Sequence, residues 1–359
     1  MENGATLNKE NNSYNIIAYL LDNADWKEED IADSKLTHIN YAFVHIREGK
    51  VVGDLKKINI LNNIKKRNRE LKTVISIGGW SADGFSDAAL NEENREIFAN
   101  SAIDFMLKNN FDGIDLDWEY PCWDQAGIKA RPEDKQNFTL MLKLLREKLD
   151  LLGSQNETHY ILSIAIGAAE DIINDMEISI IHNYLDFINI MSYDMRGSFT
   201  HTTGHHANLF SPSSEPNGIS GDKAVQKLIG LGVPKDKIIL GAAFYSRIWK
   251  GVTGEGAGLN QLAESTGGTT CNYKDMLKTY LKDNKFKRYW DDYSKAPYLF
   301  DGSTFVSYED EESLKHKADY IIDKELGGIM FWEYSLDDSL DLLNQLYKTL
   351  NKLCKENIA

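Results

Sequence analysis

Residues 112–121 have the sequence Asp-Gly-Ile-Asp-Leu-Asp-Trp-Glu-Tyr-Pro, in which acidic and apolar side chains alternate. Successive side chains of a β-strand point to opposite faces, so Asp115, Asp117 and Glu119 share one face. The intervening Ile, Leu and Trp occupy the other face, which indicates a buried strand rather than a solvated one. Because three carboxyl groups cannot face a hydrophobic layer, we expect them to line the polar interior of a closed barrel and to lead to its mouth.

Short apolar runs alternate with longer helical patterns along almost the whole chain. Most of these runs are continuously apolar, which is typical of parallel strands buried on both faces. Eight strands are predicted, at residues 16–20, 38–44, 73–77, 113–117, 160–166, 187–191, 238–243 and 328–331. The clearest helices are predicted at residues 92–109, 132–152, 221–230, 310–324 and 338–354.

This alternation predicts an α/β fold with a closed (β/α)8 TIM barrel. A doubly wound sheet is the competing arrangement, but no GxGxxG motif follows the first strand. The glycine-rich stretch at residues 76–80 follows the third strand and lacks the spacing of a phosphate-binding loop.

One connection is much longer than the others. More than 60 residues separate Ala243 from the helix predicted near Asp310, whereas βα loops usually have about 2–6 residues. The connection is rich in glycine and aromatic residues and has one helical run, at residues 274–282. We interpret residues 246–304 as a small α+β subdomain inserted after the seventh strand. Residues 16–245 and 305–354 would form the barrel, with the insertion on the face where active sites of this fold lie.

Composition and charge restrict the classes of partner. The chain has 40 Lys and Arg against 55 Asp and Glu, a formal net charge of −15. This charge repels phosphate backbones and anionic lipid surfaces, so we expect a neutral substrate and neither nucleic acid nor membrane as a partner. An acidic surface is also common for solubility alone. No apolar run approaches the roughly 18 residues of a membrane span, and the polar first 15 residues have no hydrophobic region of a secretory signal.

The cysteines and histidines do not indicate a metal site. Cys122, Cys271 and Cys354 are far apart and form no CxxC pair or Cys/His cluster, so we expect no disulfide-dependent fold. His205 and His206 are adjacent, so their side chains point in opposite directions, and no third ligand is near in the sequence. We expect neither a metal ion nor another cofactor.

The acidic strand favours acid–base chemistry. Neighbouring carboxyl groups raise each other's pKa, and a protein tolerates this cost where it needs a protonated acid near neutral pH. Glu119, the outermost of the three, can contact substrate, while Asp117 can pass it a proton or a hydrogen bond. A metal site built from three carboxylates is an alternative, which the lack of a nearby histidine weakens.

The stretch DGIDLDWE resembles the DxxDxDxE signature of glycoside hydrolase family 18, the chitinases and their relatives. Further stretches resemble family motifs in the same order: SIGG at residues 76–79, MSYD at 191–194, FYSR at 244–247 with Ser246 in place of the usual glycine, and GIMFW at 328–332. The resemblance spans residues 16–347, and the insertion is similar to the insertion domain of bacterial chitinases with deep clefts.

This resemblance implies substrate-assisted hydrolysis of β-1,4-linked N-acetylglucosamine, an exception to the usual two-carboxylate scheme. The 2-acetamido oxygen of the sugar would attack the anomeric carbon and form an oxazolinium ion. Glu119 would be the general acid and base, Asp117 would orient the acetamide N–H and share a proton with Asp115, and Tyr193 would hydrogen-bond the acetamide oxygen. The substrate-binding residues that the resemblance implies are Tyr19, Phe43, Trp80, Met191, Asp194, Tyr245, Arg247 and Trp332.

The resemblance also implies a monomeric, extracellular protein whose partner is chitin or an N-acetylglucosamine oligosaccharide. Two alternatives stay open. A chitin-binding lectin on the same fold would typically lack the catalytic glutamate, which is present here as Glu119. The second alternative is an enzyme acting on N-glycan cores or on spore- or cell-wall glycan. Glycan-core enzymes of the family tend to have an open platform, whereas the long insertion favours a deep groove for a linear polymer.

Overall fold

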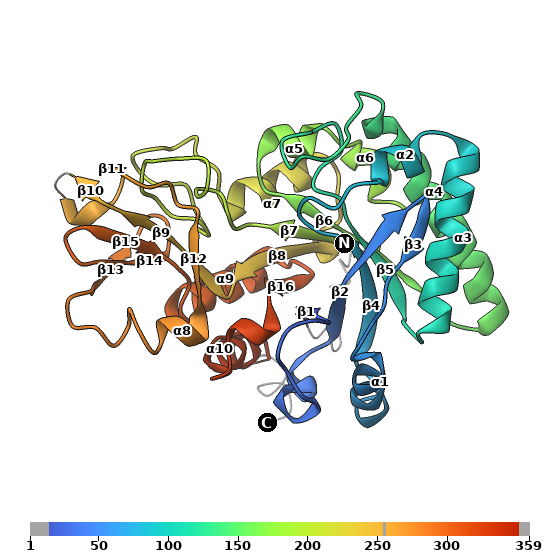
Figure 1. Ribbon diagram of the computed structural model, residues 1–359, viewed down its shortest axis with the longest axis horizontal. Coiled ribbons are helices and arrows are strands. Elements are labelled where there is room, and N and C mark those ends of the chain that lie inside the picture. Colours follow the sequence, from blue (N-terminus) through green and yellow to red (C-terminus); the bar gives the residue numbers. More distant parts are fainter. Residues whose placement is uncertain (1–13, 254–255, 352–359) are drawn as a thin grey trace, which may run out of the picture.

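The computed structural model of the protein describes residues 14–253 and 256–351, in which eight parallel strands form a closed barrel (Figure 1). The strands are β1 (Asn15–Leu21), β2 (His38–Arg47), β4 (Lys72–Gly78), β5 (Gly113–Asp117), β6 (Ile161–Gly167), β7 (Phe187–Met191), β8 (Ile238–Ala243) and β16 (Gly328–Trp332). They pair in the order β1-β2-β4-β5-β6-β7-β8-β16, and β16 pairs with β1 to close the barrel. All eight predicted strands and the predicted (β/α)8 barrel are confirmed.

Alternate residues of each strand belong to two different cores. Ile16 and Ala18 of β1 pack in the large layer between the strands and the surrounding helices. Ile17 and Tyr19, on the other face of the same strand, belong to a smaller cluster inside the barrel that also contains Met330 of β16. The strands are therefore buried on both faces, which explains their continuous apolar runs.

Helices cover the outside of the barrel. They are α1 (Ile58–Arg67), α2 (Phe85–Ala89), α3 (Glu92–Lys108), α4 (Asp134–Asn156), α5 (Glu170–Asn174), α6 (Ile178–Ile181), α7 (Gly221–Gly230), α9 (Glu311–Lys324) and α10 (Asp341–Leu350). Short 3-10 helices are η1 (Glu28–Asp30), η2 (Asp33–Lys35), η3 (Lys235–Lys237), η4 (Gly256–Gly258) and η5 (Tyr334–Leu336). A short strand, β3 (Lys50–Val52), extends β2 as a hairpin and was not predicted.

Three predicted helices differ from the structure. The helix predicted at residues 132–152 begins at Asp134 and continues to Asn156. The helix predicted at residues 338–354 begins at Asp341, because the Asp337 carboxylate accepts hydrogen bonds from Ser339 and from the Leu342 N–H and holds a turn there. It ends at Leu350, and residues 352–354 lie outside the described part of the chain. The helix predicted at 274–282 is reduced to α8 (Tyr273–Met276), since the Thr279 hydroxyl bonds the Asp275 carbonyl and competes with helical pairing.

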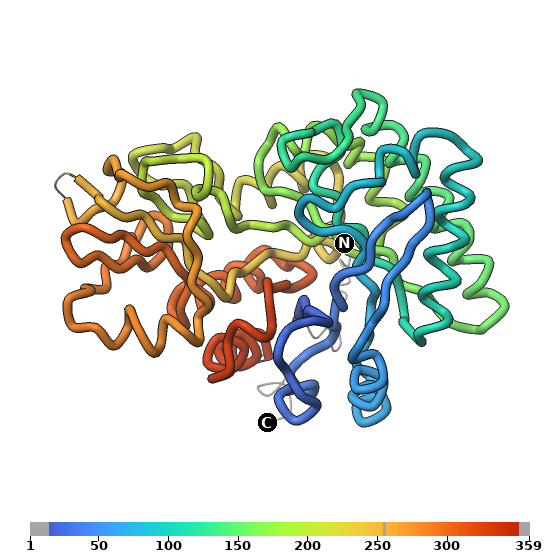
Figure 2. The backbone as a smooth tube through the Cα atoms, in the orientation of Figure 1, coloured from blue at the N-terminus to red at the C-terminus, as the bar shows by residue number. Residues whose placement is uncertain are grey.

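The long connection between β8 and α9 forms a second sheet beside the barrel, drawn in yellow to orange in Figure 2. Its strands, in the antiparallel order β12-β9-β15-β14-β13, are β9 (Tyr245–Lys250), β12 (Thr269–Asn272), β13 (Lys287–Asp291), β14 (Ala296–Phe300) and β15 (Thr304–Ser307). A two-stranded sheet of β10 (Val252–Thr253) and β11 (Leu262–Ala263) adjoins it. The segment has its own apolar cluster, which contains Trp249, Tyr298 and Phe305. The division of the chain into domains at residues 246 and 304 stays a prediction.

No helix in the described part of the chain is long and apolar enough to span a membrane.

Candidate active site

Asp115 lies fully buried in the middle of β5, inside the barrel. Its carboxylate accepts hydrogen bonds from the hydroxyls of Tyr19 (2.8 Å), Ser76 (2.7 Å) and Ser163 (2.6 Å) and from the Asn189 side-chain amide (3.3 Å). Burial raises its pKa, and the four donors oppose that rise. They come from four different strands, so Asp115 is bonded to β1, β4, β6 and β7 at once.

Asp117 is also buried, but no hydrogen bond reaches its Oδ1 atom within the described residues. Burial, together with the charges of Glu119 and Asp115, raises its pKa well above the ordinary value. Asp115 is thus surrounded by donors that favour a carboxylate, whereas Asp117 lies in surroundings that favour a neutral carboxylic acid.

Glu119 follows β5 at the barrel mouth and keeps part of its surface exposed. Burial of its carboxyl group raises the pKa of Glu119 to about 7, against an opposing hydrogen bond with Tyr120. A carboxylic acid that is still partly protonated near neutral pH is suited to general acid catalysis.

Tyr193 and Asp194 follow β7 and face the same space. Among the described residues, the Tyr193 hydroxyl has the Met330 sulfur, at 3.8 Å, as its one hydrogen-bond partner, and its ring packs edge-on against Tyr245. Asp194 accepts a hydrogen bond from Arg247 Nε at 2.6 Å. Burial by itself would raise the pKa of Asp194, but His206 and Arg247 offset it and lower the pKa below the usual range.

Aromatic rings line the part of the mouth near β1, β2 and β16. Trp332 stacks on Phe43 with centroids 5.5 Å apart and an interplanar angle of 20°. Tyr19 contacts the same tryptophan at 5.6 Å. The interior cluster brings together most of the residues that the sequence singled out: Tyr19, Phe43, Met191, Tyr193, Tyr245 and Trp332. Trp80 is not among them; its side chain is 53% exposed and contacts Trp123 instead.

Several residues that contact the carboxylates of the site were not assigned to it from the sequence, and His206 was considered there only as a metal ligand. Ser163 and Asn189 bond Asp115, and His206 lies with Nδ1 3.7 Å from Asp194 Oδ1. Ser163 and Asn189 are polar residues in the middle of apolar strand runs, a signal that strand alternation could have used. His206 had a weaker signal, because its distance from Asp194 depends on how the loop after β7 folds.

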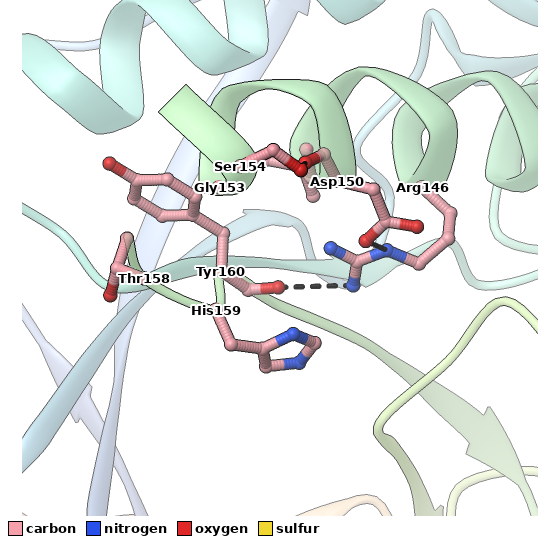
Figure 3. Close-up of a pocket in the computed structure, with 8 residues that line it drawn as sticks. Arg146, Asp150, Gly153, Ser154, Thr158, His159 and Tyr160 are labelled. Atoms are coloured by element: carbon pink, nitrogen blue, oxygen red, sulfur yellow. Dashed lines mark hydrogen bonds and ion pairs between the residues drawn. The ribbon is translucent and has the colours of Figure 1, made fainter. Parts of the chain in front are cut away.

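A cavity of about 320 Å³ lies elsewhere, between the end of α4 and the start of β6 (Figure 3). The Arg146 guanidinium in its wall donates to the Tyr160 carbonyl oxygen and pairs with Asp150 and Asp186. Since β5 and β6 are parallel, this cavity is at the opposite end of the barrel from Glu119. Through these contacts Arg146 joins α4 to the barrel. We therefore interpret the cavity as part of the packing between α4 and β6.

No three His, Cys, Asp or Glu side chains of the described residues are grouped so that they could hold a metal ion. His205 bonds Asp291 at 3.1 Å, and His206 faces Asp194. The two histidines therefore have different neighbours, in agreement with their opposite directions.

Comparison with known proteins places the chain in a family. Residues 15–337 match the model of glycosyl hydrolases family 18. The chain is 42% identical over 308 residues to chitinase A1 of Niallia circulans, covering 80% of this chain and 44% of that protein. A solved family 18 N-acetylglucosaminidase of Paenibacillus barengoltzii is similar, with 45% identity, a TM-score of 0.90, and coverage of 94% of this chain and 99% of that one.

The cell-surface-expressed, multi-modular chitinase ChiW of Paenibacillus sp. str. FPU-7 is also similar, with 44% identity and a TM-score of 0.89 over 94% of this chain and 42% of that chain. The protein therefore belongs to family 18 of the glycosyl hydrolases. It spans less than half the length of chitinase A1 and of ChiW.

Proposed function

We propose that the protein hydrolyses β-1,4 linkages between N-acetylglucosamine units in chitin or chitooligosaccharides, with retention and with the substrate acetamide as nucleophile. The observation that carries this proposal is the pair formed by Glu119, with its pKa raised to about 7, and Asp117, with a free carboxyl oxygen beside it. A protonated acid at the mouth can donate to the glycosidic oxygen. Asp117 can then accept the acetamide N–H, since no hydrogen bond of the described residues reaches its Oδ1 atom.

The carboxyl groups near Glu119 favour substrate assistance over a protein nucleophile. A retaining enzyme of the ordinary type needs a second, ionised carboxylate facing the anomeric carbon. Asp194 is bound to Arg247, and Asp115 is fully buried and bonded to four donors. Asp117 is the remaining carboxyl group on the strand, and its strongly raised pKa makes it a poor nucleophile.

Tyr193 suits the complementary role. Its hydroxyl is buried and is directed at a sulfur, a weak acceptor, so it is available to donate to the acetamide carbonyl oxygen. Such a bond holds that oxygen for attack on the anomeric carbon, and a bond from the acetamide N–H to Asp117 stabilises the positive charge that develops. The donors around Asp115 oppose the rise of its pKa, whereas the pKa of Asp117 is raised well above the ordinary value, so a proton shared by the two would lie on Asp117 in the free enzyme.

The relatives support the substrate class and the place of action. Chitinase A1 and ChiW are chitinases, and the enzyme of P. barengoltzii is an N-acetylglucosaminidase. We propose that this protein acts outside the cell, as the cell-surface ChiW does. Identification of the products from a chitin oligomer and from an N-glycan would separate chitinase action from cleavage of glycan cores.

The assignment of Glu119 is tested by Glu119→Gln, which keeps the shape of the side chain and removes the proton donor. We expect the variant to bind chitooligosaccharides and to lose a factor of roughly 10² or more in turnover. Initial rates on chitotetraose, with calorimetric binding as the control for folding, measure this. Turnover close to that of the wild type would contradict the role of Glu119.

The role of the acetamide is tested with partly deacetylated oligosaccharides. A glucosamine unit has an amine in place of the acetamide, so it offers no oxygen for attack and no partner for Tyr193. We expect cleavage to occur only after an acetylated unit, with the β-anomer as the first product by NMR. Efficient cleavage after glucosamine, or release of the α-anomer, would show that the nucleophile is not the acetamide.

A further inference from the structure

The aromatic lining of the mouth continues beyond the residues that the sequence singled out. Trp332 stacks on Phe43, and the Phe43 ring packs against Gly79, where a Cβ atom would be only 2.6 Å from it. Gly79 precedes Trp80, whose ring lies 5.9 Å from that of Trp123. The lining thus forms an arc of rings that begins at Trp332 and ends at Trp123.

Trp123 is held firmly in this position. It is partly buried and packs against the main hydrophobic core, and its ring contacts Tyr120 at 5.5 Å. The Ser81 hydroxyl donates to the Ala126 carbonyl oxygen at 2.9 Å, which joins the loop after β4 to the loop after β5. The Trp80 and Trp123 rings therefore keep a defined relative position.

The two indole rings form a corner that is open to solvent. Their planes meet at 60°, and the Trp80 side chain is 53% exposed although tryptophan is large and apolar. A pyranose ring can stack on an exposed indole face, and the second indole then contacts the edge of the sugar. The corner adjoins the acid, because Tyr120 directly follows Glu119 and touches Trp123.

We propose that Trp123 determines specificity by forming, with Trp80, the binding site for the N-acetylglucosamine unit on the leaving-group side of Glu119. This inference rests on the proposed function, in which the sugar with the attacking acetamide lies over Trp332, near Tyr193 and Asp117. The sugar with the attacking acetamide thus lies at the Trp332 end of the arc. The sugar on the other side of the cleaved bond, whose oxygen Glu119 protonates, lies at the Trp123 end.

The test compares two substrates that differ only beyond the cleaved bond. Chitotetraose has sugars on the leaving-group side, whereas chitobiosyl fluoride has a single atom there. We expect Trp123→Ala to lower kcat/KM for chitotetraose by about 10-fold, the scale of one lost aromatic contact, and to leave the fluoride within about twofold. Trp123→Phe, which retains a ring and is less disruptive to folding, should show a smaller loss with the same selectivity.

Tyr347→Ala is the matched control. Tyr347 is an exposed aromatic residue of α10, on the outside of the barrel, so both substrates should react as with wild type. Equal losses on the two substrates with Trp123→Ala would overturn the proposal and assign Trp123 to the positioning of Glu119 through Tyr120. No loss on chitotetraose would overturn it as well.

A binding measurement separates this inference from the proposed function. In the Glu119→Gln background, the fluorescence change on titration with chitotetraose should show about 10-fold weaker binding after Trp123→Ala. This result would support the sugar site even if the wild type cleaved nothing, in which case only the proposed hydrolysis would fail. Equal affinity with and without Trp123 would overturn the sugar site alone.

Discussion

At the scale of single residues, β5 carries three carboxyl groups in three different surroundings. Asp115 has four donors, Asp117 has an oxygen that no donor of the described residues reaches, and Glu119 lies at the mouth with its pKa raised to about 7. The difference arises from depth along one strand, because only the middle of the barrel offers side chains from several strands at once. A protonated acid at neutral pH thus results from position rather than from residue type.

The pH dependence of the reaction follows from this arrangement. The free enzyme must hold Glu119 protonated, so we expect kcat/KM to be constant just below pH 7 and to fall about tenfold per unit above it. Initial rates at low concentrations of a neutral chitooligosaccharide measure this fall of kcat/KM directly. A fall that begins near pH 4.5, the ordinary pKa of a glutamate, would contradict the raised pKa.

The same shift affects stability. Between pH 4.5 and 7 the folded protein keeps a proton on Glu119 that the unfolded chain releases, so the free energy of unfolding falls as the pH rises through this window. Glu119→Gln removes this contribution and should be more stable than the wild type above pH 7, by on the order of 3 kcal/mol. The difference should disappear below pH 4.5. Urea unfolding at pH 4.5 and 8 measures it, with Glu147→Gln on α4 as an exposed control.

At the scale of elements, β9 connects the site to the second sheet. Tyr245 and Arg247 belong to β9, and Arg247 holds Asp194 across the mouth. The loop after β7 packs against the same sheet, since Trp249 donates to the Thr200 carbonyl oxygen and Thr203 to that of Gly258. We therefore propose that residues 246–304 support one wall of the substrate cleft.

A shortened hairpin tests the role of this segment. Lys250 pairs with Thr304, so an Asn-Gly turn in place of residues 251–303 would join β9 to β15 and keep Arg247. We expect the variant to cleave short oligosaccharides and to bind long ones much more weakly, because distant sites supply binding energy that is used at the reacting bond. Circular dichroism and the rate on the shortest substrate control for folding. If a folded variant degraded long oligosaccharides as well as the wild type does, the proposal that residues 246–304 support a wall of the cleft would be wrong.

At the scale of the whole molecule, apolar packing holds the described part of the fold together. One large apolar cluster joins strands and helices around the barrel, a second fills its interior, and a third lies within the added sheet. Cys122 and Cys271 are free thiols. The net charge of −15 opposes self-association and suits a neutral polymer as the substrate.

We therefore expect the protein to be a monomer whose stability does not depend on redox conditions. Sedimentation velocity should give one species of monomer mass with and without a reductant, and Tm should be the same in both. Thiol titration of the unfolded, unreduced protein should find three groups, one for each cysteine of the sequence. A lower Tm in reductant, or fewer thiols, would reveal a disulfide that supports the fold.

Much of the architecture could be predicted because it depends on local patterns. Burial on both faces makes each barrel strand continuously apolar. The alternation at residues 113–119 places three carboxyl groups on one face of the strand, and this depends on no other part of the chain. Two of the helices that differ, α8 and α10, depart from prediction where the side chains of Thr279 and Asp337 bond the backbone. Hydrogen bonds of this kind compete with helix formation and are weakly marked in sequence.

By itself, then, the sequence determined the barrel, the order of its strands along the chain and the face that carries Glu119. Only the tertiary structure decided which carboxyl groups have partners, because the donors to Asp115 come from strands as much as 96 residues away, and barrel closure brings them together. It also decided that Trp123 meets Trp80 and that His206 lies beside Asp194. Each of these contacts joins loops that follow different strands or distant parts of one long loop, and no periodicity along the chain encodes the distance between two such segments.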